Sequence, residues 1–245
     1  MKKRIFVVFL ALVICVAFSS FAFANEYLDD IMAHVKLDTK NTISFIEDLE
    51  TDGYYDEAYF TIPVKGTVTL RFESKSKQMF TDTTVRVIGY ESGAFSKAYD
   101  CITPKYSSSK KVYYYEKTLT LSKDDYVIGF ECYASNLKPL NYWVNYKPSF
   151  GTTSITKVIR KKKGFTVKYS AASGATGYQV RYSRKSSMSG SKYASKTKDL
   201  YKTVSKLKTK KYYYVQVRAY KTMKVDGVTK TYYSKWSAKK KVKTK

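Results

Sequence analysis

Apolar and polar residues alternate along most of the chain. The alternation is clearest in residues 59–64 and 67–72, with Lys65-Gly66 between them. Period-two alternation predicts half-buried strands, and this pair of residues predicts the tight turn that joins them. The same pattern returns at Val85 and Val87, Leu119 and Leu121, Ile128 to Cys132, and Tyr142 to Tyr146. Short strands at this spacing predict a β-sandwich, preceded by a short helix around residues 27–35.

A second series of strands follows residue 153. Residues 154–158, 164–169, 178–182, 207–220 and 232–237 each carry the alternating pattern, and a turn is predicted at 174–177. The predicted fold class is therefore all-β, with two β-sandwich domains in tandem.

The first 24 residues have the composition of a secretory signal peptide. Lys2, Lys3 and Arg4 precede an apolar run, and Ala22-Phe23-Ala24 provides small residues for cleavage. This pattern predicts removal of residues 1–24 and a secreted, extracellular protein. A retained anchor is the alternative, but the run is short for a bilayer span of ~20 residues. Lipid attachment at Cys15 is disfavoured, because Ile14 before it is not small.

Charge divides the remaining residues sharply, about 220 in all. Residues 25–152 contain 15 Lys/Arg and 18 Asp/Glu, a net charge of −3, whereas residues 153–245 contain 27 Lys/Arg and two acids, a net charge of +25. The change marks a domain boundary, and residues 148–152 have the composition of a linker. The predicted domains are therefore 25–147 and 153–245.

Two cysteines follow the predicted cleavage site, Cys101 and Cys132. Outside the cell a pair of cysteines more often forms a disulfide than two free thiols. A bridge that closes a loop of this length would stabilise the protein by roughly 3–4 kcal/mol in the chain-entropy model.

Residues 56–70 resemble the central hairpin of bacterial pre-peptidase C-terminal-type jelly-roll domains. In that family an acidic, aromatic strand enters a Pro/Gly turn and a β-branched strand leaves it. Residues 117–128 are similar to a later strand pair of the family, although Asp124-Asp125 stands where the family has Gly. The resemblance implies a jelly-roll-like sandwich that binds an extracellular polymer or acts as a spacer.

Some members of that family bind calcium, which prefers several converging oxygen ligands. The acidic residues here form clusters at 47–52, Asp56-Glu57 and Asp124-Asp125, without an Asp-x-Asp-x-Asp-Gly loop. Solvated turns explain these clusters better, so no cofactor is predicted, and calcium is kept as the alternative.

Residues 153–245 resemble a bacterial fibronectin type III domain. The most specific element is Leu207, followed six residues later by Tyr213. In the family these two residues mark the tyrosine corner, a buried ring whose hydroxyl bonds nearby backbone. Tyr169 stands where the family usually has Trp. The resemblance therefore implies a fibronectin-like sandwich.

Basic residues run together in two places in this domain. The runs are Arg160, Lys161, Lys162, Lys163 and Lys239, Lys240, Lys241. A solvated face explains most charge runs, but a net charge of +25 on one domain destabilises a fold by self-repulsion unless an anionic partner offsets it. We therefore expect these residues to contact an anionic polymer, in a salt-sensitive and sequence-independent way.

Tyrosines alternate with lysines in residues 211–214 and 230–233. Such rings can serve as stacking platforms for nucleic-acid bases. On strands, however, alternate tyrosines are more often core residues or cross-strand pairs, and the core interpretation is favoured.

No catalytic constellation is found in the sequence. It has no His-Glu-x-x-His, no Gly-x-Ser-x-Gly and no phosphate-binding glycine loop, and its one histidine, His34, has no metal-ligand spacing around it. There is also no hydrophobic tail for wall sorting.

The sequence thus predicts a non-catalytic binding or adhesion protein, secreted or associated with the cell envelope. The basic domain would attach it to an anionic cell-wall or extracellular polymer, while the first domain would bind carbohydrate or a host protein. The alternatives are a carbohydrate-binding accessory of an extracellular enzyme system and a DNA-binding component of the extracellular matrix.

Overall fold

The computed structural model describes residues 32–43, 46–48, 53–89, 95–99, 103–133 and 137–245. The predicted signal peptide lies outside these residues. The chain divides into two compact units, Met1–Lys147 and Pro148–Lys245, which are described separately. Both consist of β-sheets, so the predicted all-β fold class is confirmed.

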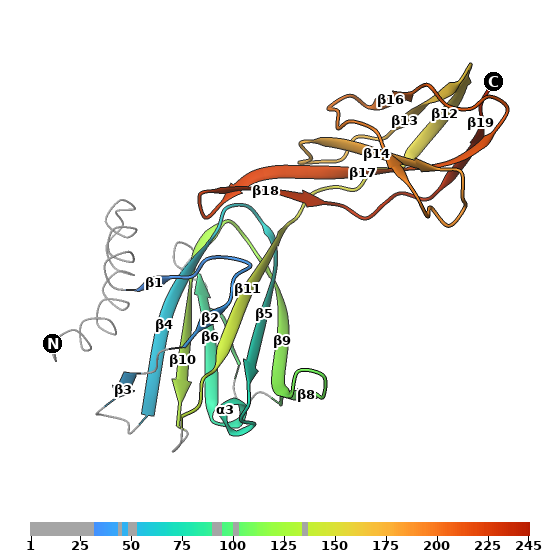
Figure 1. Ribbon diagram of the computed structural model, residues 1–245. Coiled ribbons are helices and arrows are strands. Elements are labelled where there is room, and N and C mark those ends of the chain that lie inside the picture. The colour runs from blue at the N-terminus through green and yellow to red at the C-terminus, as the bar shows by residue number, and fades with distance from the viewer. Residues whose placement is uncertain (1–31, 44–45, 49–52, 90–94, 100–102, 134–136) are drawn as a thin grey trace, which may run out of the picture. The chain divides into compact units, whose positions relative to one another are not determined.

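Two sheets form the first unit (Figure 1). One has the order β1 (Ala33–His34), β4 (Gly53–Ile62), β10 (Asp124–Cys132), β6 (Thr83–Gly89) and β7 (Phe95–Tyr99), with β3 (Ile46–Asp48) also paired to β4. The other has the order β2 (Asn41–Thr42), β11 (Asn141–Pro148), β5 (Gly66–Ser74), β9 (Val112–Leu121) and β8 (Lys105–Ser107). A short helix, α3 (Gln78–Thr81), connects β5 to β6. A helix was expected around residues 27–35, but among the described residues of this range Ala33–His34 form strand β1.

The hairpin that the resemblance of residues 56–70 implies does not form. The two strands form, as β4 and β5, but they lie in different sheets, and β9 and β10 are divided in the same way. Antiparallel pairing places Ile62 opposite Asp124 and Gly66 opposite Leu121, so the two connections lie next to each other at one end of the sandwich. The apolar faces of consecutive strands therefore meet across the core, where sheets pack about 10 Å apart, and not side by side within one sheet.

The core of the first unit lies between the two sheets. Its fully buried side chains come from strands of both, including Phe60, Ile62, Leu70, Phe72 and Phe130. Phe72 and Phe130 meet edge to face, with ring centroids 6.0 Å apart. The arrangement is the one that alternation predicts for a sandwich.

The second unit also contains two sheets. Strands β12 (Ile155–Lys161), β13 (Gly164–Tyr169) and β16 (Tyr201–Val204) form one. Strands β15 (Lys192–Tyr193), β14 (Gly177–Ser183), β17 (Tyr212–Val225) and β18 (Val228–Tyr233) form the other, and β19 (Lys240–Lys243) pairs with the start of β17. Its core includes Phe165, Val167, Val180, Val215 and Val217, all fully buried.

Residues 234–239 lie between β18 and β19 and interrupt the backbone pairing of β17 with these two strands. Two serine hydroxyls complete the hydrogen bonding there: Ser234 Oγ accepts from the Ala219 N–H at 3.0 Å, and Ser237 Oγ accepts from the Val217 N–H at 3.1 Å. Regular antiparallel pairing with β17 then resumes in β19. The interruption carries Trp236 between the two serines.

Residues 148–152, which have linker composition, are ordered at both ends. Strand β11 continues to Pro148, and the Gly151 N–H donates to the Ser173 carbonyl at 2.7 Å. A Cβ at Gly151 would approach Ser173 N to 2.6 Å, so this close approach requires glycine.

Candidate functional site

The first predicted basic run lies in the turn between β12 and β13. Three backbone hydrogen bonds join this turn to two other segments. The Lys245 N–H donates to the Lys161 carbonyl at 3.0 Å, the Lys163 N–H donates to the Lys245 carbonyl at 3.1 Å, and the Leu207 N–H donates to the Lys163 carbonyl at 2.9 Å. The turn therefore meets both the loop before β17 and the residues after β19.

Two buried side chains hold that loop in place. Thr244, 1% exposed, donates through Oγ1 to the Lys208 carbonyl at 2.7 Å and accepts from the Lys211 N–H at 3.2 Å. At the predicted tyrosine corner, Tyr213 is 6% exposed and its hydroxyl accepts from the Lys208 N–H at 3.2 Å, while Leu207 packs against the core. The loop thus has a fixed path.

We call the resulting surface the lysine end. It consists of nine exposed lysines from the three joined segments: Lys161, Lys162, Lys163, Lys206, Lys208, Lys210, Lys211, Lys243 and Lys245. Residues 160–163, 206–211 and 243–245 contain no acid. Many like charges are therefore brought together by backbone contacts and not by ion pairs.

Three of these lysines have left-handed backbone conformations. The φ angles are +51° at Lys163, +60° at Lys206 and +53° at Lys210. This conformation costs a non-glycine residue roughly 1–2 kcal/mol, and glycine would adopt it freely. The sequence has a charged side chain at each of these three positions instead.

The remaining predicted basic residues take different places. Arg160 donates through Nε to the Lys243 carbonyl at 2.8 Å, next to the lysine end. Lys239 donates through Nζ to the Ser186 carbonyl at 2.7 Å, Lys240 is exposed, and Lys241 lies 4.2 Å from the centre of the Tyr212 ring. The structure therefore brings the first run into one cluster and divides the second.

A group of stacked cations and aromatic rings lies on the outer face of the sheet that contains β14 and β17. The centre of the Trp236 ring is 4.3 Å from Cζ of Arg181 and 4.3 Å from Cζ of Arg218. Arg218 also lies 3.7 Å from the centre of the Tyr233 ring. Beyond it, Lys196 Nζ lies 5.2 Å from Tyr233 and 4.7 Å from Tyr220. We call these six residues the ladder.

Glutamines hold the two arginines of the ladder. Gln216 Oε1 accepts from Nε and Nη2 of Arg181 at 3.0 and 2.6 Å, and Gln179 Oε1 accepts from the same atoms of Arg218 at 3.1 and 2.7 Å. Gln216 in turn donates to the Ser237 carbonyl at 2.6 Å. Burial lowers the pKa of Arg218, and nearby Arg181 lowers it further, although Tyr233 and Tyr193 oppose this. Two close cations are therefore held in place by neutral groups.

The ladder was not predicted from the sequence. The signal for it is the triplet Gln-Val-Arg, which occurs twice, at residues 179–181 and 216–218. Antiparallel pairing of β14 and β17 sets Gln179 opposite Arg218 and Arg181 opposite Gln216. The repeat therefore encodes two reciprocal Gln–Arg pairs.

The alternating tyrosines of β17 divide between core and surface. Tyr213 lies in the core, whereas Tyr212 is 49% exposed. Lys241 and Lys243 of β19 lie 4.2 and 5.4 Å from the centre of the Tyr212 ring. Since Lys243 also belongs to the lysine end, these contacts connect the lysine end to the outer face that carries the ladder.

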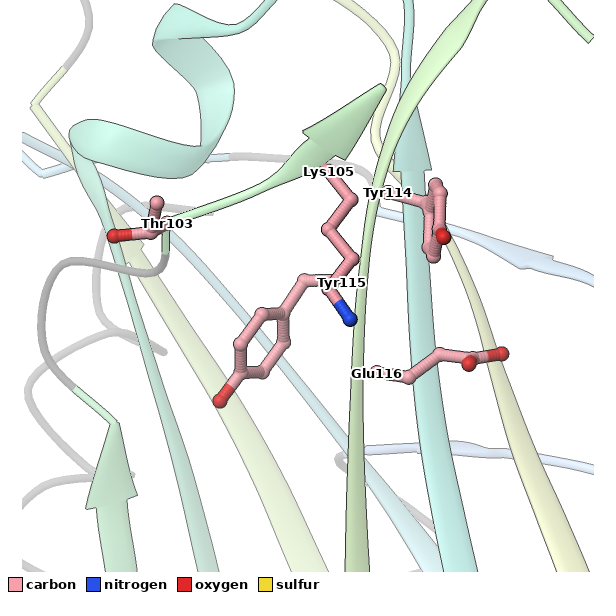
Figure 2. A pocket seen from close by; sticks show the side chains of 5 residues that line it. All are labelled: Thr103, Lys105, Tyr114, Tyr115 and Glu116. Atoms are coloured by element: carbon pink, nitrogen blue, oxygen red, sulfur yellow. The ribbon is translucent and has the colours of Figure 1, made fainter. Parts of the chain in front are cut away.

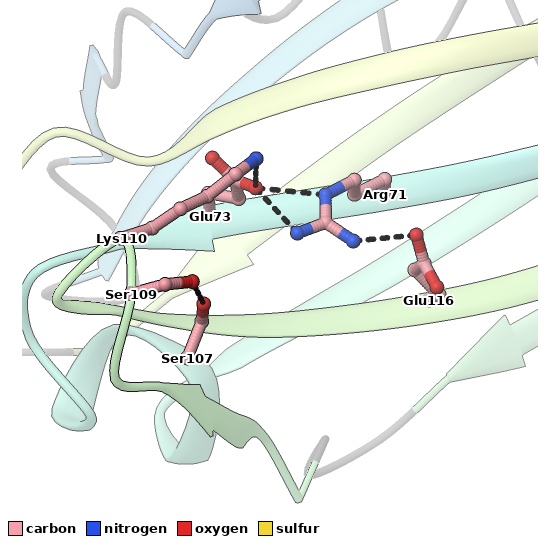
Figure 3. A network of polar contacts seen from close by, with 6 residues as sticks. All are labelled: Arg71, Glu73, Ser107, Ser109, Lys110 and Glu116. Carbon is pink, nitrogen blue, oxygen red and sulfur yellow. Dashed lines mark hydrogen bonds and ion pairs between the residues drawn. The ribbon is translucent and has the colours of Figure 1, made fainter.

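In the first unit, charged side chains form a network on the outer face of β5 and β9 (Figure 3). Arg71 contacts Glu73 and Glu116, each at 2.5 Å, and Lys110 contacts Glu73 at 3.2 Å. Burial disfavours ionisation of Glu73, but the hydrogen bonds from Arg71 and Lys110 outweigh it and lower its pKa. These charges therefore compensate one another.

A pocket of about 230 Å³ lies beside this network, where β8 begins alongside β9. Thr103, Lys105, Tyr114, Tyr115 and Glu116 line it. In Figure 2, Tyr115 projects to one side of β9, and Tyr114 and Glu116 project to the other. Aromatic rings beside hydroxyl, ammonium and carboxylate groups are suited to a small polar ligand with one apolar face.

Cys132 is fully buried at the end of β10. Its predicted partner, Cys101, lies outside the described residues, so the disulfide stays a prediction. Of the acidic clusters, Asp124 is mostly buried and accepts from the Asp125 N–H at 2.9 Å. Residues 46–48, 53–89 and the rest of the described chain contain no group of three or more His, Cys, Asp or Glu placed to hold a metal ion.

His34 is exposed on β1, with its ring 4.8 Å from the ring of Tyr59. Within the part of the chain that the structure describes, no helix is long and apolar enough to cross a membrane.

No family model matches the chain, and no curated protein matches it. Among solved structures, a β-1,2-glucanase from Parabacteroides distasonis is similar over 78% of this chain, with 9% identity and a TM-score of 0.32. The chain covers 30% of that enzyme's length. These values carry no argument about function.

Two other solved structures are similar to parts of the chain. One is a fibronectin-like protein from Clostridium thermocellum, with 19% identity, a TM-score of 0.29, and coverage of 38% of this chain and 92% of its own. The other is a human fibronectin type III domain, with 20% identity, a TM-score of 0.27, and coverage of 39% and 83%. These values carry no argument either, so the fibronectin and pre-peptidase resemblances both stay predictions.

Proposed function

We propose that the protein is a secreted, non-catalytic binding protein whose second unit attaches to an anionic polymer of the cell envelope. The lysine end is the attachment surface. The observation that carries this proposal is the joining of three acid-free basic segments by backbone hydrogen bonds.

The electrostatics of the lysine end favour a polymeric partner. Nine ammonium groups on one end of a small unit repel one another, and the unit has only two acids to offset them. A polyanion relieves this repulsion at several points at once and releases its own counterions, so binding is strong at low salt and weak at high salt. A single small anion would neutralise only part of the surface.

The proposal is tested by retention of the purified protein on isolated cell walls over a salt series. We expect retention at low salt and release in moderate salt. The variant Lys161→Gln/Lys162→Gln/Lys163→Gln is expected to elute at clearly lower salt, since each lost contact lowers the slope of log affinity against log salt by about 0.7–0.9.

Its matched control is Lys168→Gln/Lys198→Gln/Lys224→Gln, which removes the same charge from three exposed lysines. Lys168 pairs with Tyr201 and Lys224 with Thr229, on strand segments outside the lysine end. The control is expected to elute close to wild type. Equal shifts of the two triple variants would contradict a defined site, and no retention at low salt would refute the function.

The pocket beside β8 and β9 favours a second function, carbohydrate binding by the first unit. Tyr115 offers an aromatic ring, while Thr103 and Lys105 offer polar groups for sugar hydroxyls.

A glycan array probed with wild type and with Tyr115→Ala tests this second function. Binding of a defined glycan that Tyr115→Ala abolishes and Tyr133→Ala retains would support it. Tyr133 is a suitable control because it is 58% exposed and lies outside the pocket. No glycan bound above background would refute it.

A further inference from the structure

The ladder has an excess of positive charge that its own neighbours do not neutralise. Arg181, Arg218 and Lys196 contact rings and glutamine carbonyls in the contacts described above, and none of them forms an ion pair among the described residues. Each guanidinium presents its Nε–Nη2 edge to a glutamine. Nη1 of each arginine takes no part in these hydrogen bonds to the glutamines.

The ladder is also held in one geometry before any ligand arrives. The Arg218 guanidinium lies between the rings of Tyr233 and Trp236. Arg181, on the neighbouring strand β14, also contacts the Trp236 ring. The two glutamines fix the rotation of each guanidinium plane. Arginines that are already fixed lose little conformational entropy when they bind an oxyanion, and a planar guanidinium edge matches two oxygens of a phosphate group.

The sheet face that carries the ladder also carries residues that lead along β17 to the lysine end. Tyr212, Tyr214, Gln216, Arg218 and Tyr220 alternate along β17 and so point to one face. Lys243 and Lys241 pair with Tyr212 and Tyr214. Basic groups thus follow the strand at intervals of about 6.7 Å, the spacing of every second residue.

On this geometry, and resting on the proposed function above, we infer that the ladder face extends the lysine end and binds a phosphodiester polymer that lacks bases. Arg181 and Arg218 each hold a phosphate group, and Lys241 and Lys243 hold further groups toward and within the lysine end. A chain with a charge in each short repeat unit fits the spacing of these cations.

The occupied ring faces favour a base-free polymer over nucleic acid. Bases bind single-strand proteins by stacking on free aromatic faces. In the ladder, Arg181 and Arg218 already lie against the Trp236 ring, and Arg218 and Lys196 lie against the Tyr233 ring. Recognition through oxyanions is therefore favoured over stacking of bases on these two rings.

Fluorescence of Trp236 gives a local readout of binding. The chain has two tryptophans, so Trp143→Phe leaves Trp236 as the only one. In this background we expect poly(glycerol phosphate) to change the emission of Trp236. Arg181→Gln/Arg218→Gln is expected to weaken binding roughly tenfold and to lower the salt slope by about 1.4, at roughly 0.7 for each lost contact on a flexible single chain.

Two further variants separate recognition from structure. Lys168→Gln/Lys224→Gln removes the same charge away from the ladder and is expected to bind like the background protein. Arg181→Lys/Arg218→Lys keeps the charge but removes the planar edge, and it is expected to lose most of the affinity while the protein remains folded by circular dichroism.

The outcomes distinguish this inference from the proposed function. The Arg181/Arg218 variants could bind as tightly as the control while Lys161→Gln/Lys162→Gln/Lys163→Gln binds more weakly than the control. In that case the ladder is structural and only the inference fails. If single-stranded oligothymidylate of equal charge binds much more tightly than poly(glycerol phosphate), the face reads bases and the inference is overturned. If the unmodified chain binds neither polymer, both proposals fail.

Discussion

The hydroxyl of the buried Tyr213 accepts a hydrogen bond of 3.2 Å from the backbone N–H of Lys208. This bond links the hydrophobic core of the second unit to the loop that presents Lys206, Lys208, Lys210 and Lys211. The same contact that closes the sandwich therefore also sets the path of part of the binding surface.

Tyr213→Phe is expected to destabilise the second unit by about 1 kcal/mol, because the ring stays buried and only the hydrogen bond is lost. Urea unfolding measures this as a lower midpoint with an unchanged slope. Tyr212→Phe is the control, since that ring is 49% exposed and its hydroxyl makes no hydrogen bond described for the chain. A Tyr213→Phe protein as stable as Tyr212→Phe would show that the corner bond contributes nothing.

The tyrosine corner was predictable because its two marker residues lie close in the sequence. Leu207 and Tyr213 are six positions apart, and period-two alternation from Tyr213 onward assigns Val215, Val217 and Ala219 to the core. The ladder was not predicted, because its members come from β14, β17, the end of β18 and the segments around Lys196 and Trp236. Only the register of antiparallel pairing brings them together, and one sequence does not reveal that register directly.

Register is also the reason why the hairpin implied for residues 56–70 does not form. Alternation identified both strands, but it does not show whether the strand after a turn pairs with the one before it or crosses to the other sheet. Pro63 and the three-residue connection to Gly66 are compatible with either arrangement. The pairing of Ile62 with Asp124 and of Gly66 with Leu121 decides it.

Gly66 occupies a position in the first unit where a side chain does not fit. A Cβ there would lie 2.6 Å from the Lys147 carbonyl oxygen and would overlap the Tyr146 ring. Gly66→Ala is therefore expected to destabilise the first unit by about 1–3 kcal/mol, as overpacking does elsewhere. Gly129→Ala is the matched control, because its Cβ would come no closer than 3.6 Å, to the Glu57 side chain. Thermal unfolding of both variants checks this, and equal midpoints would contradict it.

Glu57 gives the first unit a pH-dependent stability. Burial raises its pKa above the usual 4.5, and the charges of Asp56 and Glu131 raise it further, against the effect of Arg86. A carboxyl with a raised pKa binds its proton more tightly in the folded state, so ionisation of Glu57 destabilises the fold as pH rises past that value. Glu57→Gln is expected to be more stable than wild type at pH 7.

The gain from Glu57→Gln is expected to disappear well below pH 4.5, where both proteins carry a neutral group at this position. Urea midpoints measured across this range check the sign. A difference between the two proteins that is the same at both pH values would assign the effect to packing and not to charge.

The second unit is expected to gain stability from salt, because its residues after 152 carry a net charge of +25. Raising the salt from about 0.1 M to about 1 M shortens the Debye length from roughly 10 Å to roughly 3 Å and screens the repulsion between its lysines. If screening restores about 1 kcal/mol, its thermal midpoint rises by roughly 4–8 °C. The first unit, with a net charge of −3 over residues 25–152, serves as the internal control. Val180→Ala, which opens a cavity in the second core only, identifies the transition that belongs to the second unit. Equal salt responses of the two transitions would show that self-repulsion does not limit the second unit's stability.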